Sequence, residues 1–117
     1  MSKPIAFIVE DDPQLSKIFS VSLQTEFVSE VASDGDIALV RLAEIVPALV
    51  ILDLHLPSRS GKEILMYIRS DVRLANTHVI ICTADERQAQ ELEDKADIVL
   101  LKPVSPTQLR QIASRFK

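Results

Sequence analysis

Short apolar runs rich in Val and Ile recur along the sequence, and segments with helical spacing of apolar residues separate them. This alternation constrains the fold most, because strands that alternate with helices predict a parallel sheet with helical crossovers. Right-handed crossovers place the helices on both faces of such a sheet. The sequence therefore predicts a doubly wound α/β fold with five parallel strands at Ile5–Val9, Phe27–Ala32, Ala48–Leu52, Val79–Cys82 and Ile98–Leu101.

Five helices are predicted from caps and apolar spacing. Asp12 is a typical N-cap with Pro13 behind it, and Ser105 opens a capping box that reaches Gln108. The polar segment 85–95 predicts either a short exposed helix or a partly ordered one. The other predicted helices span 13–26, 34–44, 61–71 and the residues from Pro106 to the end of the chain. The first should bury a stripe formed by Leu15, Ile18, Phe19, Ser22 and Leu23.

Length and charge narrow the classes of function. A chain of 117 residues fits one domain, here residues 1–117. The net charge of -4 argues against direct binding to nucleic acid or to an anionic membrane. No apolar run is long enough to span a bilayer, and the N-terminus lacks the features of a signal peptide, so we expect a cytoplasmic protein. The single cysteine, Cys82, lies in an apolar run and is expected to be buried.

Polar residues follow four of the five predicted strands. In an open parallel sheet, ligands bind beyond the carboxyl ends of the strands. The residues expected at that edge are Glu10, Asp11, Asp12, Asp53, Thr83 and Lys102.

Three of these acids predict a metal site. If the first and third strands are neighbours, Asp11, Asp12 and Asp53 converge, and their mutual repulsion requires a cation. Oxygen ligands favour a hard divalent ion, most plausibly Mg²⁺. Lys102 and Thr83 would then cradle a group with negatively charged oxygens. Asp53 could serve as a nucleophile towards phosphorus.

Each residue also has an ordinary structural interpretation. The adjacent acids could form a solvated turn in which Asp12 only caps a helix. Thr83 alone could be a strand-end hydroxyl, and Lys102 alone a surface charge. Their joint placement at successive strand ends favours a functional site.

Five motifs resemble the receiver domain of two-component response regulators, and the resemblance covers essentially the whole chain. It implies the flavodoxin-like strand order 2-1-3-4-5. The motifs are "VEDD" at Val9–Asp12, "ASDG" at Ala32–Gly35, "LDLHLPSRSG" at Leu52–Gly61, "TA" at Thr83–Ala84 and "LKP" at Leu101–Pro103.

The resemblance implies a role for each site residue. Asp53 would accept a phosphoryl group from a sensor histidine kinase or a histidine phosphotransfer protein. Asp12 and Asp53 would bind Mg²⁺ directly, Asp11 would bind it through water, and His55 would add its backbone carbonyl. His55 lies two residues beyond the acceptor and could be an ordinary solvent-facing loop residue, but its side chain can reach over the phosphoryl group, so we expect it to influence the lifetime of that group.

Further residues of the site follow from the same resemblance. Thr83 and Lys102 would hold the phosphoryl oxygens, and the Lys102–Pro103 bond would be cis. Pro57 and Gly61 would shape the loop after the acceptor. A receiver of this kind catalyses only its own phosphorylation and dephosphorylation, and it switches the binding of a downstream partner.

Two departures from the family pattern concern the output side. Val99 stands three residues before Lys102, where the family usually has Tyr, Phe or His as a rotating residue. The segment between Thr83 and Lys102 is also about one helical turn shorter than the family norm, and Lys95 replaces a usual Gly.

These departures leave alternatives open. The chain could be a pseudo-receiver that acts as a docking or dimerisation module without the phosphorylation switch, and a homodimer is compatible with either interpretation. A small phosphatase with an aspartyl nucleophile would need a cap or pocket insertion, for which the sequence has no room.

Overall fold

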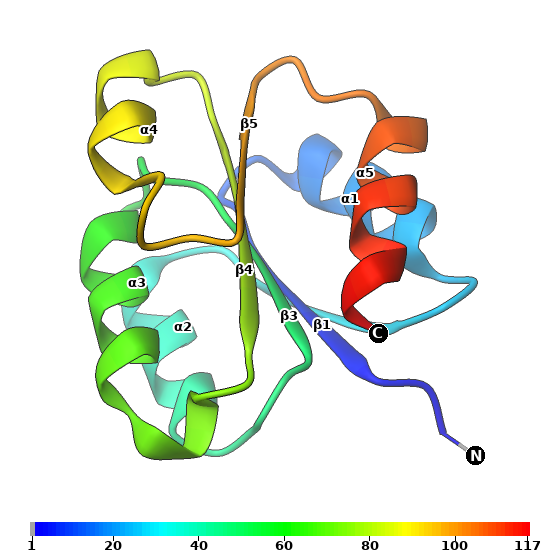
Figure 1. Cartoon of the computed structure of the whole chain (residues 1–117), viewed down its shortest axis with the longest axis horizontal. Coiled ribbons are helices and arrows are strands. Elements are labelled where there is room, and N and C mark those ends of the chain that lie inside the picture. Colours follow the sequence, from blue (N-terminus) through cyan, green and yellow to red (C-terminus); the bar gives the residue numbers. More distant parts are fainter. Residues whose placement is uncertain (1) are drawn as a thin grey trace.

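A computed structural model describes residues 2–117, and its central feature is a five-stranded sheet in which every pair of neighbouring strands is parallel. The strand order is β2-β1-β3-β4-β5, which confirms the predicted fold class. Crossover helices connect consecutive strands (Figure 1). The strands are β1 (Ile5–Val9), β2 (Val28–Ala32), β3 (Leu49–Leu52), β4 (His78–Thr83) and β5 (Ile98–Leu101).

Helices cover both faces of the sheet. One face carries α1 and α5, and the other carries α2, α3 and α4 (Figure 1). Single 3₁₀ turns follow α3 and α5, at Val72–Leu74 and Ser114–Phe116. The helices are α1 (Pro13–Leu23), α2 (Gly35–Leu42), α3 (Gly61–Ser70), α4 (Glu86–Leu92) and α5 (Pro106–Ala113).

The core has two layers, one on each side of the sheet. Along β1, Phe7 and Val9 contribute to the layer under α2 and α3, whereas Ala6 and Ile8 contribute to the layer under α1 and α5. Central strands are buried on both faces, which explains why they appear in the sequence as continuous apolar runs. The edge strand β2 differs, since its Val28 and Val31 are exposed.

Helix starts follow the predicted caps, but several helix ends do not follow the predicted ranges. Asp12 and Ser105 accept hydrogen bonds from the first turns of α1 and α5, as predicted. The first helix ends at Leu23 rather than residue 26, because the backbone N–H groups of Gln24 and Glu26 bond to carbonyls only three residues back and form a turn. Phe27 then enters the core. The segment 85–95 forms only the short helix α4, where Ala89 and Leu92 are buried.

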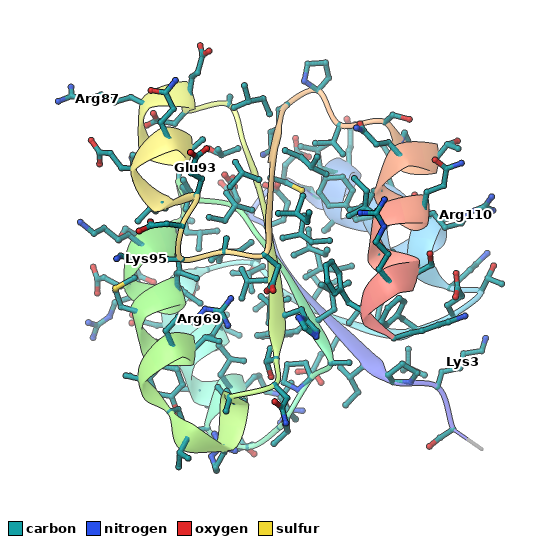
Figure 2. All side chains as sticks on the ribbon, viewed as in Figure 1. Lys3, Arg69, Arg87, Glu93, Lys95 and Arg110 are labelled. Carbon is teal, nitrogen blue, oxygen red and sulfur yellow. The ribbon has the colours of Figure 1, made fainter. Side chains whose placement is uncertain are left out.

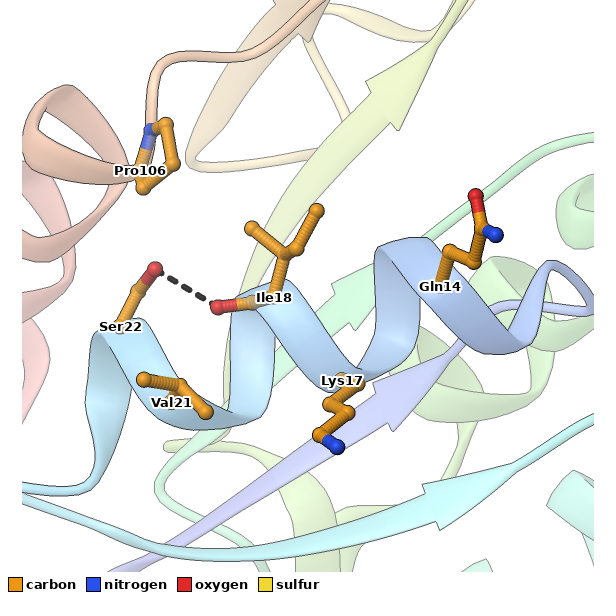
Figure 3. A pocket seen from close by; sticks show the side chains of 6 residues that line it. All are labelled: Gln14, Lys17, Ile18, Val21, Ser22 and Pro106. Carbon is orange, nitrogen blue, oxygen red and sulfur yellow. Dashed lines mark hydrogen bonds between the residues drawn. The ribbon is translucent and has the colours of Figure 1, made fainter.

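The predicted buried stripe of α1 is wrong at Ile18, which is 43% exposed. This side chain lines a groove of about 580 Å³ between α1 and the start of α5, together with Val21 and Pro106 (Figure 3). Helical spacing identifies the buried side of a helix, but it does not give the width of the buried stripe.

Apart from the buried Glu10 and Asp53, the charged side chains of the described residues are at least partly exposed. Lys3, Arg87 and Arg110 project away from the sheet (Figure 2). Cys82 is buried, as predicted, and burial raises the pKa of its thiol to about 12. Among the helices formed by residues 2–117, none has the length and apolar character needed to cross a membrane.

Candidate functional site

Residues at the carboxyl ends of β1, β3, β4 and β5 meet at one edge of the sheet, the upper edge in Figure 1. In the register of β1 and β3, Val9 lies opposite Leu52, so the next residues, Glu10 and Asp53, lie side by side. The backbone N–H of Lys102 donates a hydrogen bond to the Thr83 carbonyl at 2.8 Å. This bond holds Lys102 at the same edge as Glu10 and Asp53. The parallel register therefore brings Asp53, Thr83 and Lys102 to one edge.

Three carboxylates form the centre of this edge. Oxygens of Glu10, Asp11 and Asp53 all lie within 4.8 Å of one another. Glu10 and Asp53 are buried, and Asp11 is exposed. Clustered carboxylates are hard oxygen donors, and this donor set suits a divalent cation such as Mg²⁺.

Asp12 lies outside this group, although the sequence prediction gave it direct contact with the metal. Its Oδ1 accepts the backbone N–H of Gln14 at 2.9 Å and that of Leu15 at 3.4 Å, so the carboxylate caps α1. Its own backbone N–H donates to Glu10 Oε2. Glu10 takes part in the acidic group instead. Two sequence signals point to this assignment: Pro13 makes Asp12 the helix cap, and Glu10 directly follows the strand.

Lys102 compensates part of the negative charge. Its Nζ lies 2.8 Å from Glu10 Oε1 and 3.2 Å from Asp53 Oδ2. Burial alone would lower the pKa of Lys102, but the two carboxylates outweigh burial and hold this pKa above its ordinary value. Burial raises the pKa of Glu10, and the hydrogen bond from Lys102 offsets only part of this effect. The single ammonium group of Lys102 does not balance the charge of three carboxylates, and a divalent cation would balance the remaining negative charge.

A second set of contacts joins the residues that follow β3 and β4 at this edge of the sheet. The buried Thr83 hydroxyl accepts the backbone N–H of Asp85 at 3.1 Å. His55 Nε2 lies 2.8 Å from Asp85 Oδ2, and the His55 backbone N–H points to Asp53 Oδ1 at 3.4 Å. The backbone N–H of Gln88, followed by His55, lowers the pKa of Asp85. The sequence analysis did not identify Asp85, because no local pattern shows that it meets His55.

The loop after β3 passes very close to Asp53. A Cβ atom on Gly61 would lie 2.2 Å from the Asp53 carbonyl oxygen and 2.5 Å from Leu54 Cα, so this position requires glycine. The Pro57 carbonyl accepts two backbone N–H groups and holds the turn of the loop. The Lys102–Pro103 peptide bond is cis, as expected.

Val99, one of the two predicted departures from the family pattern, lies in β5. There, Val99 pairs with Ile81 of the neighbouring strand β4, and its side chain is half-buried. A groove of about 190 Å³ separates β5 from α4 and is lined by Val99, Leu101 and Glu93 among others (Figure 2 labels Glu93). The side chain at position 99 is too short to fill this groove.

Comparison with known proteins identifies a family. A sequence model of the response regulator receiver domain matches residues 6–114. The chain is 33% identical over 106 residues to the DNA-binding response regulator MtrA of Mycolicibacterium smegmatis, covering 87% of this chain and 45% of MtrA. The chain thus spans about half the length of the MtrA proteins that it matches.

Solved structures agree with this comparison. The BeF3-activated DrrB receiver domain superimposes with a TM-score of 0.86 at 27% identity, over 97% of each chain. The chemotaxis response regulator CheY4 of Vibrio cholerae gives a TM-score of 0.89 at 23% identity, over 99% of this chain and 100% of CheY4, a likeness of fold.

Proposed function

The chain belongs to the response regulator receiver domain family of two-component systems, and we propose that Asp53 is its phosphoacceptor. The observation that supports this role is the contact between the buried Asp53 carboxylate and Lys102 within the acidic group. A receiver is not a conventional enzyme, and histidine kinases are the partners of the family. For this chain, the proposed donor is a sensor histidine kinase or a histidine phosphotransfer protein.

The proposed reaction transfers one phosphoryl group. A carboxylate oxygen of Asp53 forms the new O–P bond while the N–P bond of the donor phosphohistidine breaks. The electron pair of the N–P bond stays on the imidazole nitrogen, which takes up a proton. Lys102, which contacts the Asp53 carboxylate, would pair with the negative charge on the phosphoryl oxygens, and the Thr83 hydroxyl would donate a hydrogen bond to one of them.

The proposed cofactor is Mg²⁺, and we assign its ligands from the acidic group. Asp11, Asp53 and the backbone carbonyl of His55 would hold the ion, and Glu10 would assist them, in place of Asp12. When bound, Mg²⁺ neutralises charge that develops on the transferring oxygens. Before transfer, the protein residues keep the Asp53 carboxylate oriented through the Lys102 ammonium and the His55 backbone N–H.

A second candidate is a pseudo-receiver that docks or dimerises without the usual switch. Val99 and the seven-residue helix α4 favour it, because a short aliphatic side chain offers no ring to move when Thr83 moves. Under either candidate we propose that residues 1–117 form one domain that works in the cytoplasm.

Intact mass spectrometry combined with hydrogen exchange separates the two candidates. The protein is incubated with a small acyl phosphate and Mg²⁺, and the mass of one added phosphoryl group is measured. A working receiver gains the group and also changes amide protection in α4 (Glu86–Leu92). A pseudo-receiver lacks the adduct, or carries it with no change in α4. An undiminished adduct in Asp53→Asn would overturn the assignment of the acceptor.

A further inference from the structure

The loop after β3, residues Leu54–Ser60 (the acceptor loop), is hydrogen-bonded to the N-terminus of α2. The Gly35 backbone N–H donates to the Pro57 carbonyl at 3.0 Å, and the Asp36 backbone N–H donates to Ser58 Oγ at 3.0 Å. The first N–H groups of a helix have no partner within the helix. The acceptor loop therefore completes the cap of α2, and the phosphoryl-transfer chemistry described above does not use this contact.

The two backbones touch at Gly35. A Cβ atom there would lie 2.3 Å from Arg59 Cβ, 2.8 Å from the Arg59 carbonyl oxygen and 2.9 Å from Arg59 Cα. Backbone atoms of this kind cannot rotate away as a long side chain would. Any side chain at position 35 must therefore displace the acceptor loop or α2.

Ser58 makes a second, independent set of contacts with the start of α2. Its φ is 67°, in the left-handed region, and it is the one residue other than glycine with a positive φ among the residues that the structure describes. Its hydroxyl accepts the Asp36 backbone N–H and points to Asp34 Oδ1 at 3.4 Å. Arg59 Nε adds a contact to Asp36 Oδ1 at 2.9 Å. A non-glycine residue keeps this backbone conformation only where its surroundings enforce it.

The other end of the acceptor loop contacts the phosphoacceptor. The His55 backbone N–H lies 3.4 Å from Asp53 Oδ1, and the Gly61 backbone N–H donates to the Leu54 carbonyl at 2.9 Å. Only the short stretch between His55 and Pro57 separates the Asp53 contact from the α2 contact. A displacement of the loop at α2 must therefore move the peptide of His55.

We propose that the N-terminus of α2, through Gly35 and Ser58, is a positioning element that sets the acceptor loop for Mg²⁺. This inference rests on the proposed function, which places the His55 carbonyl and the Asp53 carboxylate among the ligands. Mg²⁺ demands nearly ideal octahedral geometry, whereas Ca²⁺ accepts irregular sets of oxygen ligands at longer distances. A loosened loop therefore weakens the binding of Mg²⁺ more than that of Ca²⁺.

The ratio of the two affinities tests the proposal without any measurement of phosphorylation. Isothermal titration calorimetry with MgCl₂ and with CaCl₂ gives both dissociation constants for wild type, Gly35→Ala and Ser58→Ala. We expect the affinity for Mg²⁺ to fall about 10-fold or more in both variants, as when supporting partners of a metal site are lost, and the affinity for Ca²⁺ to fall less, so that the preference for Mg²⁺ decreases. Ser58→Ala keeps the proposal testable if Gly35→Ala fails to fold.

Two further variants serve as controls. Arg41→Ala removes the ion pair with Glu30 at the opposite end of α2, so it destabilises the helix without touching the acceptor loop. Ser58→Asn supplies a residue that tolerates the left-handed region and retains a side-chain acceptor. Both controls should keep the wild-type ratio of affinities.

The possible outcomes distinguish a failure of the positioning role from a failure of the proposed metal site. Wild-type ratios in folded Gly35→Ala and Ser58→Ala would overturn the positioning role and leave the metal site intact. An equal loss in Arg41→Ala would overturn it as well, because general destabilisation would then explain the loss. Wild-type protein that binds neither cation would overturn the proposed metal site, and the positioning role with it.

Discussion

Replacing Asp53 with Asn should stabilise the metal-free protein, although it removes one partner of Lys102. Asp53 lies within 4.8 Å of both Glu10 and Asp11. At an effective dielectric constant of about 20, each repulsion at that distance is at least about 3.5 kcal/mol, about 7 kcal/mol for the two. The attraction to Lys102 at 3.2 Å is about 5 kcal/mol by the same rule. Repulsion therefore exceeds attraction by about 2 kcal/mol.

Urea unfolding in EDTA measures this difference directly. We expect Asp53→Asn to raise the free energy of unfolding by about 2 kcal/mol, or the Tm by roughly 8 °C. Lys102 stays paired with Glu10 at 2.8 Å, so its charge is not left alone. Asp94→Asn, at an exposed acid in the turn after α4, is the matched control and should change stability by less than about 0.5 kcal/mol.

Adding Mg²⁺ should reverse the order of stability. A cation that binds only the folded state stabilises it in proportion to its affinity, and Asp53→Asn lacks one of the proposed ligands. Wild type should thus gain more from Mg²⁺ than the variant gains. An Asp53→Asn protein that is less stable than wild type in EDTA would refute the reasoning, since the charges at the site would not then repel on balance.

Three further predictions concern single side chains. Lys102→Met should lower the free energy of unfolding in EDTA by about 3 kcal/mol at pH 7. This deficit should shrink as the pH falls towards the carboxyl range, because the raised pKa of Glu10 favours protonation of the folded state, and a deficit independent of pH would contradict this. His55→Ala should shorten the lifetime of the phosphoryl group severalfold, followed by mass spectrometry, because the link to Asp85 is lost; an unchanged lifetime would count against it. Cys82 should react with a thiol reagent only in urea, since burial raises its pKa to about 12, and rapid labelling of native protein would disagree.

The strands themselves follow from the sequence because this sheet is buried on both faces, whereas their order was implied by the resemblance to receiver domains. In a small α/β fold, runs of Val and Ile without polar residues are typical of strands that are buried on both faces of the sheet. The β1 range Ile5–Val9 and the β5 range Ile98–Leu101 agree with the prediction at both ends. Helix starts were also predictable, since caps such as Ser105 are local signals.

Features that depend on distant contacts could not be predicted with the same success. Three consecutive acids follow β1, and the pattern alone does not show which of them faces Asp53. The backbone register and the helix cap decide that Glu10 and Asp11 do, and that Asp12 does not. The closeness of Gly35 to the acceptor loop likewise arises only when α2 and the loop fold together.

The central claim is that Asp53 receives the phosphoryl group with the help of a divalent cation. Borohydride reduces an aspartyl phosphate to homoserine, so peptide mass spectrometry after reduction locates the modified residue. Wild type treated with an acyl phosphate and Mg²⁺ should carry homoserine at position 53, and the same protein in EDTA should carry little. Homoserine at another acid such as Asp11, or none in the presence of Mg²⁺, would contradict the account.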